Sequence, residues 1–365
     1  MRRFLAILSS AALALSLGGC TLFPSALRGM ERLAIVQALG ADRESGGVHL
    51  SLVTAADSSR GEGPVRMDGR GATIADAASD AAAHAAEERL FCAHTAFVLL
   101  GEESARKDVE ALLRYVCRSR EIRMDVPLLI VRGASAAEAL LQSGDERVGA
   151  AELLHALDAS AAERLGEGLP TVARIAGRLE SGGCALAAAM VCAPSSEQAE
   201  GERSLTLAPA GLAVLKDGAL AAFLDSEEAV GVDLLCGAQG RHDFTVTDRA
   251  GQRVTLRTAP GRTELRRVRG EDGAEALDVT VRLTASVVEI DGTGDLADSA
   301  YADELAALLE RELLRRAAAV LRLEKELDAD FLCLRERALL GAGETPPLRL
   351  SAAVRVGHAD DVRDG

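Results

Sequence analysis

Few residues of this chain have both the type and the spacing that catalysis or metal binding requires. Cys92 and His94 stand two residues apart and could supply two metal ligands, but no third ligand lies near them in the sequence. We therefore interpret this pair as a structural thiol and a structural histidine. The histidines are scattered singly, at His49, His84, His94, His155, His242 and His358. Motifs such as G-x-S-x-G, H-E-x-x-H, a Walker loop or G-x-G-x-x-G after a strand do not occur, so we predict no catalytic residue, no metal site and no cofactor.

The seven cysteines do not form a recognisable redox or zinc motif. No C-x-x-C pair occurs, which excludes a zinc ribbon and a thioredoxin-like centre. If the apolar stretch between Cys184 and Cys192 is a strand, about 26 Å separates the two thiols, which is too far for a disulfide. Apart from Cys20 we expect mostly buried free thiols, and disulfide pairing stays open for Cys92, Cys117, Cys184, Cys192, Cys236 and Cys333.

Two charged segments could bind an ion or a partner. Glu102 and Glu103 follow a predicted strand at the start of a helix, where an anion could bind, but these acids complement the helix dipole themselves and would repel an anion. A basic strip lies on a later predicted strand, at Arg262, Arg266, Arg267 and Arg269. This strip could face lipid headgroups or an acidic partner. We favour a solvated strand edge that discourages aggregation.

The residue with the most specific chemical context is Cys20. A basic start, Met1-Arg2-Arg3, precedes about fourteen apolar or small residues from Phe4 to Leu17, and Gly18-Gly19 follow. As a helix the run would span roughly 21 Å, which is short for a bilayer core of about 30 Å and typical of a signal peptide.

Leu17-Gly18-Gly19-Cys20 resembles the lipobox of bacterial lipoproteins. In that family the cysteine thiol receives a diacylglyceryl group, cleavage makes the cysteine residue one, and its amine is acylated, for example with palmitate. Because each buried CH₂ contributes about 0.8 kcal/mol, a cysteine with several acyl chains would anchor the protein firmly. The alternative is a plain signal peptide with a chance cysteine.

Composition limits the partners of the mature chain. The net charge is −15, and removal of residues 1–19 takes Arg2 and Arg3 with it and makes it −17. Such an acidic chain argues against nucleic acid as a partner and against broad adhesion to anionic lipid. With 48% hydrophobic residues the chain can form packed cores, whereas 2% aromatic residues and no Trp argue against an aromatic ligand cage.

The hydrophobic pattern predicts a multi-domain α+β fold with mixed or antiparallel sheets and packed helices. Up to residue 145 we expect the order β-β-α-β-α-β-α, with a loop over 58–71 and one helix over 102–123. The segment 146–200 is mainly helical by its pattern and ends in the apolar stretch 184–192. From residue 243 a period of two predicts a curved antiparallel sheet, covered by a long helix over about 301–330 with Leu305, Leu309, Leu313, Val320 and Leu327 as its buried stripe.

We accordingly divide the chain at its polar and Gly-containing segments, above all at 195–204. The predicted regions are a lipoprotein signal peptide (1–19), a tether (20–29), an N-terminal α+β region (30–200, divisible into 30–145 and 146–200) and a C-terminal domain (204–360).

Several motifs, in this order, resemble the Ger(x)C lipoproteins, the C subunits of nutrient germinant receptors in endospore-forming bacteria. The family pattern of Gly-His, an apolar strand, Gly-Glu-Glu and then Arg-Asp-x-Glu-x-Arg is met by His94, Gly101, Glu102, Glu103, Arg118, Glu121 and Arg123. Ala93 and Ser119 depart from it, where the family has glycine and aspartate. Leu224, Glu228 and Asp330 match the central and C-terminal segments, so the similarity covers nearly the whole mature chain.

The resemblance implies a three-domain α+β protein without catalytic activity. It would be anchored on the outer face of the spore inner membrane and would assemble with A-type and B-type membrane subunits into a receptor for small nutrients. Two alternatives remain open. One is a membrane-tethered hydrolase with a site assembled from distant residues such as His94 and Asp125. The other is a solute-binding lipoprotein, which would need a cleft between two similar lobes.

Overall fold

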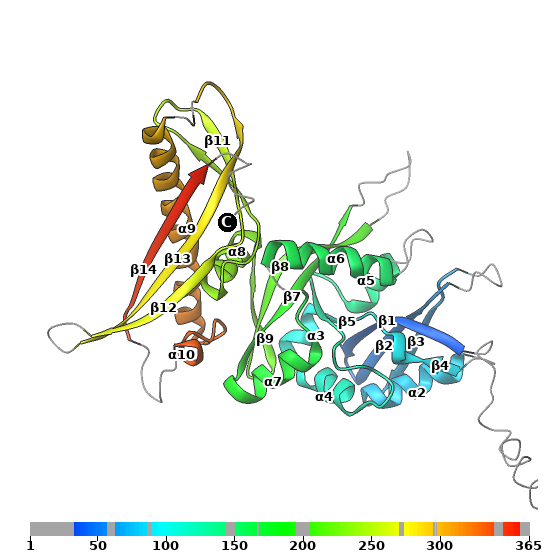
Figure 1. Cartoon of the computed structure of the whole chain (residues 1–365). Coiled ribbons are helices and arrows are strands. Elements are labelled where there is room, and N and C mark those ends of the chain that lie inside the picture. Colours follow the sequence, from blue (N-terminus) through cyan, green and yellow to red (C-terminus); the bar gives the residue numbers. More distant parts are fainter. Residues whose placement is uncertain are drawn as a thin grey trace, which may run out of the picture.

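Two β-sheets organise the chain, and each is packed against helices (Figure 1). The computed structural model describes residues 33–56, 63–85, 89–142, 150–165, 168–194, 205–269, 274–294, 296, 298–338 and 346–357. The mixed α+β fold class expected from the sequence is confirmed.

The larger sheet has nine strands within the described residues, in the order β3-β2-β1-β5-β6-β7-β8-β9, with β4 paired beside β1. The pairs β1–β5, β5–β6 and β6–β7 are parallel, and antiparallel pairs flank them on both sides. Its strands are β1 (Leu33–Glu44), β2 (Gly47–Thr54), β3 (Arg66–Gly71), β4 (Arg89–Phe91), β5 (Phe97–Gly101), β6 (Leu128–Arg132), β7 (Cys184–Pro194), β8 (Leu205–Lys216) and β9 (Ala219–Leu224).

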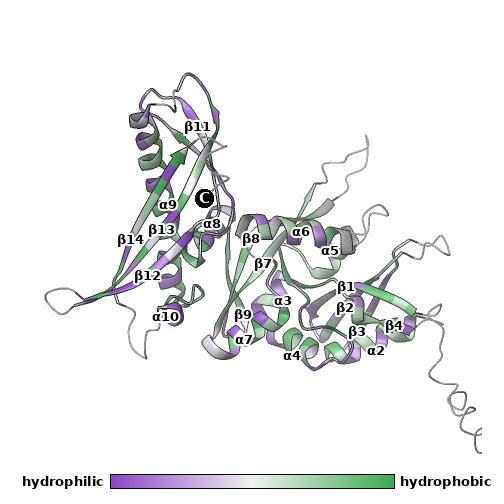
Figure 2. Ribbon diagram, in the orientation of Figure 1, coloured by the Kyte–Doolittle hydropathy of each residue, from purple (hydrophilic) through white to green (hydrophobic). Residues whose placement is uncertain are grey.

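Helices bury both faces of this sheet. Leu128 and Ile130 of β6 share a core with residues of α2, α4 and α7, whereas Leu129 and Val131 share a core with residues of α5 and α6. A strand buried on both faces reads as a continuous apolar run, and Figure 2 shows the central strands in the hydrophobic colour. The helical segments are α2 (Ile74–His84), η3 (Cys92–His94), α3 (Glu102–Lys107), α4 (Glu110–Arg118), α5 (Ala136–Gln142), α6 (Ala150–Leu165) and α7 (Val172–Gly182).

The smaller sheet packs one face on the long helix α9. In this sheet β11 and β12 pair antiparallel with β13, β10 pairs antiparallel with β11, and β14 lies parallel to β13 on its other side. Leu305, Leu309, Leu313 and Val320 form the buried stripe of α9, as expected, and Leu327 is partly buried. The elements are α8 (Ser226–Cys236), β10 (Asp243–Thr247), β11 (Arg253–Thr258), β12 (Arg262–Arg269), β13 (Glu275–Ile290), α9 (Ser299–Leu327), α10 (Leu334–Arg337) and β14 (Leu348–Gly357).

The predicted loop over 58–71 is wrong at its C-terminal end, because Arg66–Gly71 forms the edge strand β3. Its glycines, which suggest a loop in the sequence, serve close packing instead. A Cβ on Gly69 would lie 2.1 Å from the carbonyl oxygen of Ala77, so only glycine lets α2 rest directly on this strand.

The single helix predicted over 102–123 is also wrong. Asp108 has extended backbone angles and separates α3 from α4. Its side chain accepts a hydrogen bond from the N–H of Ala111, and the N–H of Val109 donates to the carbonyl of Gly218 in the β8–β9 turn. These bonds replace helical ones, which is why aspartate favours a helix boundary here.

The predicted boundary segment 195–204 lies outside the described residues. The strands on either side of it, β7 and β8, are paired antiparallel in the larger sheet, and β9 extends the same sheet. The larger sheet therefore includes residues on both sides of the proposed boundary.

Candidate functional site

The proposed lipid site, Cys20, lies in the segment 1–32, outside the described residues. In the described regions of the chain, every helix is either too short or too polar to cross a bilayer.

Cys92 and His94 lie in the short helix η3 and do not meet a further ligand. Burial, and then the negative charge of Glu121, raise the pKa of the Cys92 thiol to about 11, so this thiol is protonated at neutral pH. The exposed ring of His94 packs against Phe91, with 5.6 Å between the ring centroids. Throughout the described residues, no three His, Cys, Asp or Glu side chains converge closely enough to hold a metal ion.

The other residues that the sequence singles out are scattered over the fold. The Nε2 atom of His49 lies 2.9 Å from the carboxylate of Asp68, and His155 is exposed on α6, while His358 falls outside the described residues. The six cysteines that are described are free thiols, and Cys184 and Cys192 occupy opposite ends of the strand β7, as their spacing predicted. The expectation that most of these thiols are buried is wrong, because of the six only Cys184 is buried, while Cys117 and Cys236 are exposed.

The Gly-Glu-Glu segment stabilises its own turn. Burial would raise the pKa of Glu102, but hydrogen bonds from the N–H of Gly133 and from Arg106 outweigh burial and lower that pKa. This carboxylate therefore occupies the space near the start of α3 that an anion would need, which agrees with the interpretation from the sequence.

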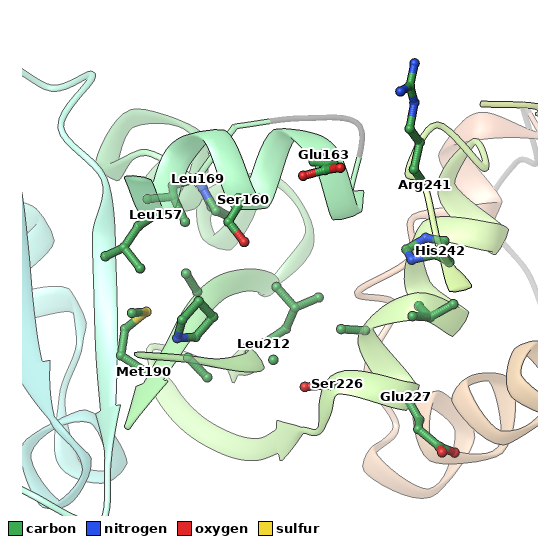
Figure 3. A pocket seen from close by; sticks show the side chains of 18 of the residues that line it. Leu157, Ser160, Glu163, Leu169, Met190, Leu212, Ser226, Glu227, Arg241 and His242 are labelled. Atoms are coloured by element: carbon green, nitrogen blue, oxygen red, sulfur yellow. The ribbon is translucent and has the colours of Figure 1, made fainter. Parts of the chain in front are cut away.

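A cavity of about 490 Å³ lies between elements of the two sheets (Figure 3). Its apolar wall comes from α6, β7, β8 and α8, and includes Leu157, Leu169, Met190, Pro209, Leu212 and Val230. Ser160 points its hydroxyl into the cavity, and the His242 ring borders the opposite end (Figure 3). A volume of this size lies within the usual range of small-molecule sites.

Most charged groups at the polar end of this cavity are already paired. Arg257 makes two hydrogen bonds of 2.7 Å with Asp243, and these lower the pKa of that carboxyl. Arg316 hydrogen-bonds Glu312 at 2.8 Å and lies over the ring of Phe244. The side chain of Arg241 points away from the cavity (Figure 3). The cavity thus presents an apolar interior with few unpaired charges.

A buried histidine–aspartate pair borders the cavity. The Nε2 atom of His242 lies 2.9 Å from Asp233, and both side chains are almost completely buried. Asp233 also accepts hydrogen bonds from the N–H groups of Gln239 and Gly240. Within the described residues no hydroxyl hydrogen-bonds the ring of His242, so the pair lacks the nucleophile of a hydrolytic triad and fastens the end of α8 to the start of β10.

Sequence reasoning did not single out this pair, because Asp233 and His242 are nine residues apart on either side of an irregular turn and match no motif. The residues named for a hydrolase, His94 and Asp125, are both exposed and do not line the cavity, and Asp125 pairs with Arg123 at 3.1 Å. The solute-binding alternative required two similar lobes, whereas the two sheets here differ in topology.

Comparison with known proteins gives two family matches in chain order. Residues 28–161 match the family described as "Spore germination protein N-terminal domain", and residues 210–338 match "Spore germination B3/ GerAC like, C-terminal". The crystal structure of the GerBC protein is similar in fold, with 15% sequence identity, a TM-score of 0.54, and coverage of 87% of this chain and 96% of that one. No curated protein matches the chain.

Proposed function

This chain belongs to the GerAC-like family of spore germination proteins, and from that premise we propose that it is the lipid-anchored, non-catalytic subunit of a nutrient germinant receptor. In this proposal Cys20 carries the diacylglyceryl and N-acyl groups that hold the protein on the outer face of the spore inner membrane.

The order of the motifs is the observation that carries the proposal. Leu17-Gly18-Gly19-Cys20 lies shortly before the first matched segment, which begins at residue 28, and the second segment follows from residue 210. A lipid on Cys20 would place the N-terminal end of β1 within thirteen residues of the bilayer, a span of at most about 47 Å in an extended chain. A paired buried histidine and an apolar cavity without an aligned nucleophile fit a protein that works through contacts with other subunits.

The proposed partners are the A-type and B-type membrane subunits of the receptor, which would detect small nutrients. With these partners, the role of this subunit is to complete the assembly at the membrane surface.

Replacement of Cys20 by alanine tests the anchor. We expect Cys20→Ala to remove the protein from the membrane fraction of sporulating cells and to abolish germination with nutrients, because no acyl chain can be attached. Immunoblotting of membrane and aqueous fractions and loss of optical density after nutrient addition measure the two effects.

Cys117→Ala is the matched control, since Cys117 is an exposed free thiol on α4. This variant should stay in the membrane fraction and germinate normally. Full membrane retention and normal germination of Cys20→Ala would contradict the proposal.

A further inference from the structure

The smaller sheet has one face that its helices do not cover. The apolar residues Leu277 and Val279 of β13 belong to the core with α8 and α9, and Val281 and Leu283 belong to the core with α9. Alternate residues such as Thr280 and Arg282 therefore point to the opposite face. Figure 1 shows α9 running behind β13 and β14, so the uncovered face is turned to the reader.

Strand register shows which charged residues share this uncovered face, which we call the arginine face. Directly paired residues lie on the same side of a sheet, so the register of β10 to β14 assigns every member. Its arginines are Arg253, Arg262, Arg266, Arg282, Arg349 and Arg355, and its carboxylates are Glu264, Asp278, Glu289 and Asp291, which pairs with Arg253 at 3.2 Å. Arg257 and Asp243 lie on the same side of the sheet, but they pair with each other and line the cavity, so they are not counted. Six against four gives a net charge of +2, in a chain whose net charge is −15.

The local pairing of charges leaves positive charge in excess. Arg262 and Arg282 are direct cross-strand neighbours, an arrangement of like charges that costs stability. Glu264 lies 3.1 Å from Arg262 and 3.4 Å from Arg282, and it also contacts Arg266, so one carboxylate serves three guanidinium groups.

The excess of positive charge is clearest on the strand β14. Among the described residues, no carboxylate lies within ion-pair distance of Arg349 or Arg355, and both side chains are exposed. Between the arginines the face carries short hydroxyl side chains, such as Thr280 and Ser351, whose oxygens are 2.9 Å apart. The basic strip expected at four arginines is therefore split, since Arg267 and Arg269 pair with Leu277 and Glu275 on the other side of the sheet.

We propose that the arginine face is a contact surface for the anionic headgroups of a phospholipid bilayer. This inference rests on the proposed anchoring at Cys20, which keeps the protein beside a bilayer. An anionic surface repels the rest of the acidic chain and attracts this face, so electrostatics selects one orientation of the tethered body. In its described residues the face has no aromatic side chain, and Val268 at the end of β12 is its only exposed large apolar residue assigned by register, so the contact is made mainly at the headgroups and weakens in salt.

The test uses residues 21–365, which is the mature chain without Cys20 and its acyl groups, so that its outcome does not depend on Cys20. Co-sedimentation with vesicles of phosphatidylglycerol and phosphatidylcholine is compared with sedimentation on phosphatidylcholine alone. We expect binding to the anionic vesicles only, at about 50 mM salt, with loss of binding at about 500 mM. An arginine near an anionic surface contributes about fivefold to binding, so Arg349→Gln with Arg355→Gln should weaken binding roughly 30-fold.

The matched control is Arg118→Gln with Arg120→Gln, which removes the same charge from an exposed segment outside the smaller sheet. This control should change binding less than about threefold. Circular dichroism checks that both variants fold. If the Arg349→Gln, Arg355→Gln variant does not fold, Arg262→Gln with Arg266→Gln provides a second variant of the arginine face.

The inference would be overturned if the protein did not bind anionic vesicles at low salt, or if the arginine-face variant and the control variant lost vesicle binding equally. So would unchanged vesicle binding of the face variant together with lost co-purification of receptor subunits, which would assign the face to an acidic protein. None of these outcomes bears on whether Cys20 is acylated.

Discussion

The two sheets of this protein differ in how many of their faces are covered by helices. In the larger sheet, helices cover both faces, and consecutive residues such as Leu128 and Leu129 are both fully buried. In the smaller sheet α8 and α9 cover one face, so that Leu283 is buried and its neighbour Arg282 is exposed. The first arrangement holds a rigid body together, and the second leaves a patterned surface free for contact.

This difference explains where charge can be placed. A strand buried on both faces cannot carry an arginine without a large desolvation cost. A strand with a solvated face can, and β12, β13 and β14 do so at alternate positions along a portion of their length. Consecutive residues of a strand point to opposite faces, so substitutions at two consecutive residues in each sheet measure whether both faces are buried.

The largest effects should come from truncations in the core. We expect Leu128→Ala and Leu129→Ala each to lower the free energy of unfolding by about 2–5 kcal/mol, because each leaves a cavity on one face of β6. On β13, Leu283→Ala should cost a similar amount, whereas Thr284→Ala should cost less than about 0.5 kcal/mol. Urea denaturation measures all four, and a large cost for Thr284→Ala would show that the second face is also covered.

A smaller effect is expected at the buried pair beside the cavity. Asp233→Ala leaves the His242 ring and the N–H of Gly240 without their acceptor, which should cost about 3 kcal/mol. Asp243→Ala breaks an exposed ion pair with Arg257 and should cost less than about 1 kcal/mol. Thermal unfolding distinguishes the two, and equal costs would mean that Asp233 does not fasten α8 to β10.

The smallest effect concerns pH. Burial, with a further contribution from Asp330, raises the pKa of Glu324 to about 7, even though the carboxylate accepts a hydrogen bond from the N–H of Leu332. Because this pKa is higher when folded than its usual 4.5, the folded chain binds the proton more tightly, and stability falls as pH rises from about 4.5 to 7.

Glu324→Gln keeps an acceptor for Leu332 but cannot ionise. We expect it to be about 1–2 kcal/mol more stable than the parent at pH 8 and equal to it at pH 4, after allowance for partial solvent exposure. Urea denaturation at the two pH values measures this, and an identical pH dependence of both proteins would contradict the assignment.

The spacing of hydrophobic residues predicted an element correctly where that spacing was regular over its whole length. Leu305, Leu309, Leu313 and Val320 recur at helical spacing without Gly or Pro, and they form the buried stripe of α9. The edge strand β3 could not be found this way, because Gly69 and Gly71 indicate a turn by composition and reveal their packing role only against α2. β14 escaped prediction since its partner, β13, lies about seventy residues earlier in the chain.

The candidate site was less predictable than the fold. The cavity brings together residues from Leu157 to Arg316, and it is bordered by His242, whose buried partner Asp233 lies nine residues away and matches no motif. The basic strip was visible in the sequence, but its division between two faces required the register of β12 on β13. Composition reports how much charge a chain has, and only pairing in three dimensions reports which way that charge points.

The antiparallel pairing of β7 with β8 has a practical consequence for anyone who dissects this protein. Two fragments made by dividing the chain between residues 194 and 205 would each contain one strand of this pair, which is hydrogen-bonded along the whole of Cys184–Pro194. Each fragment alone would expose an unpaired strand edge, which favours aggregation. The same pairing means that residues 205–224, although they follow the proposed boundary, fold as part of the larger sheet.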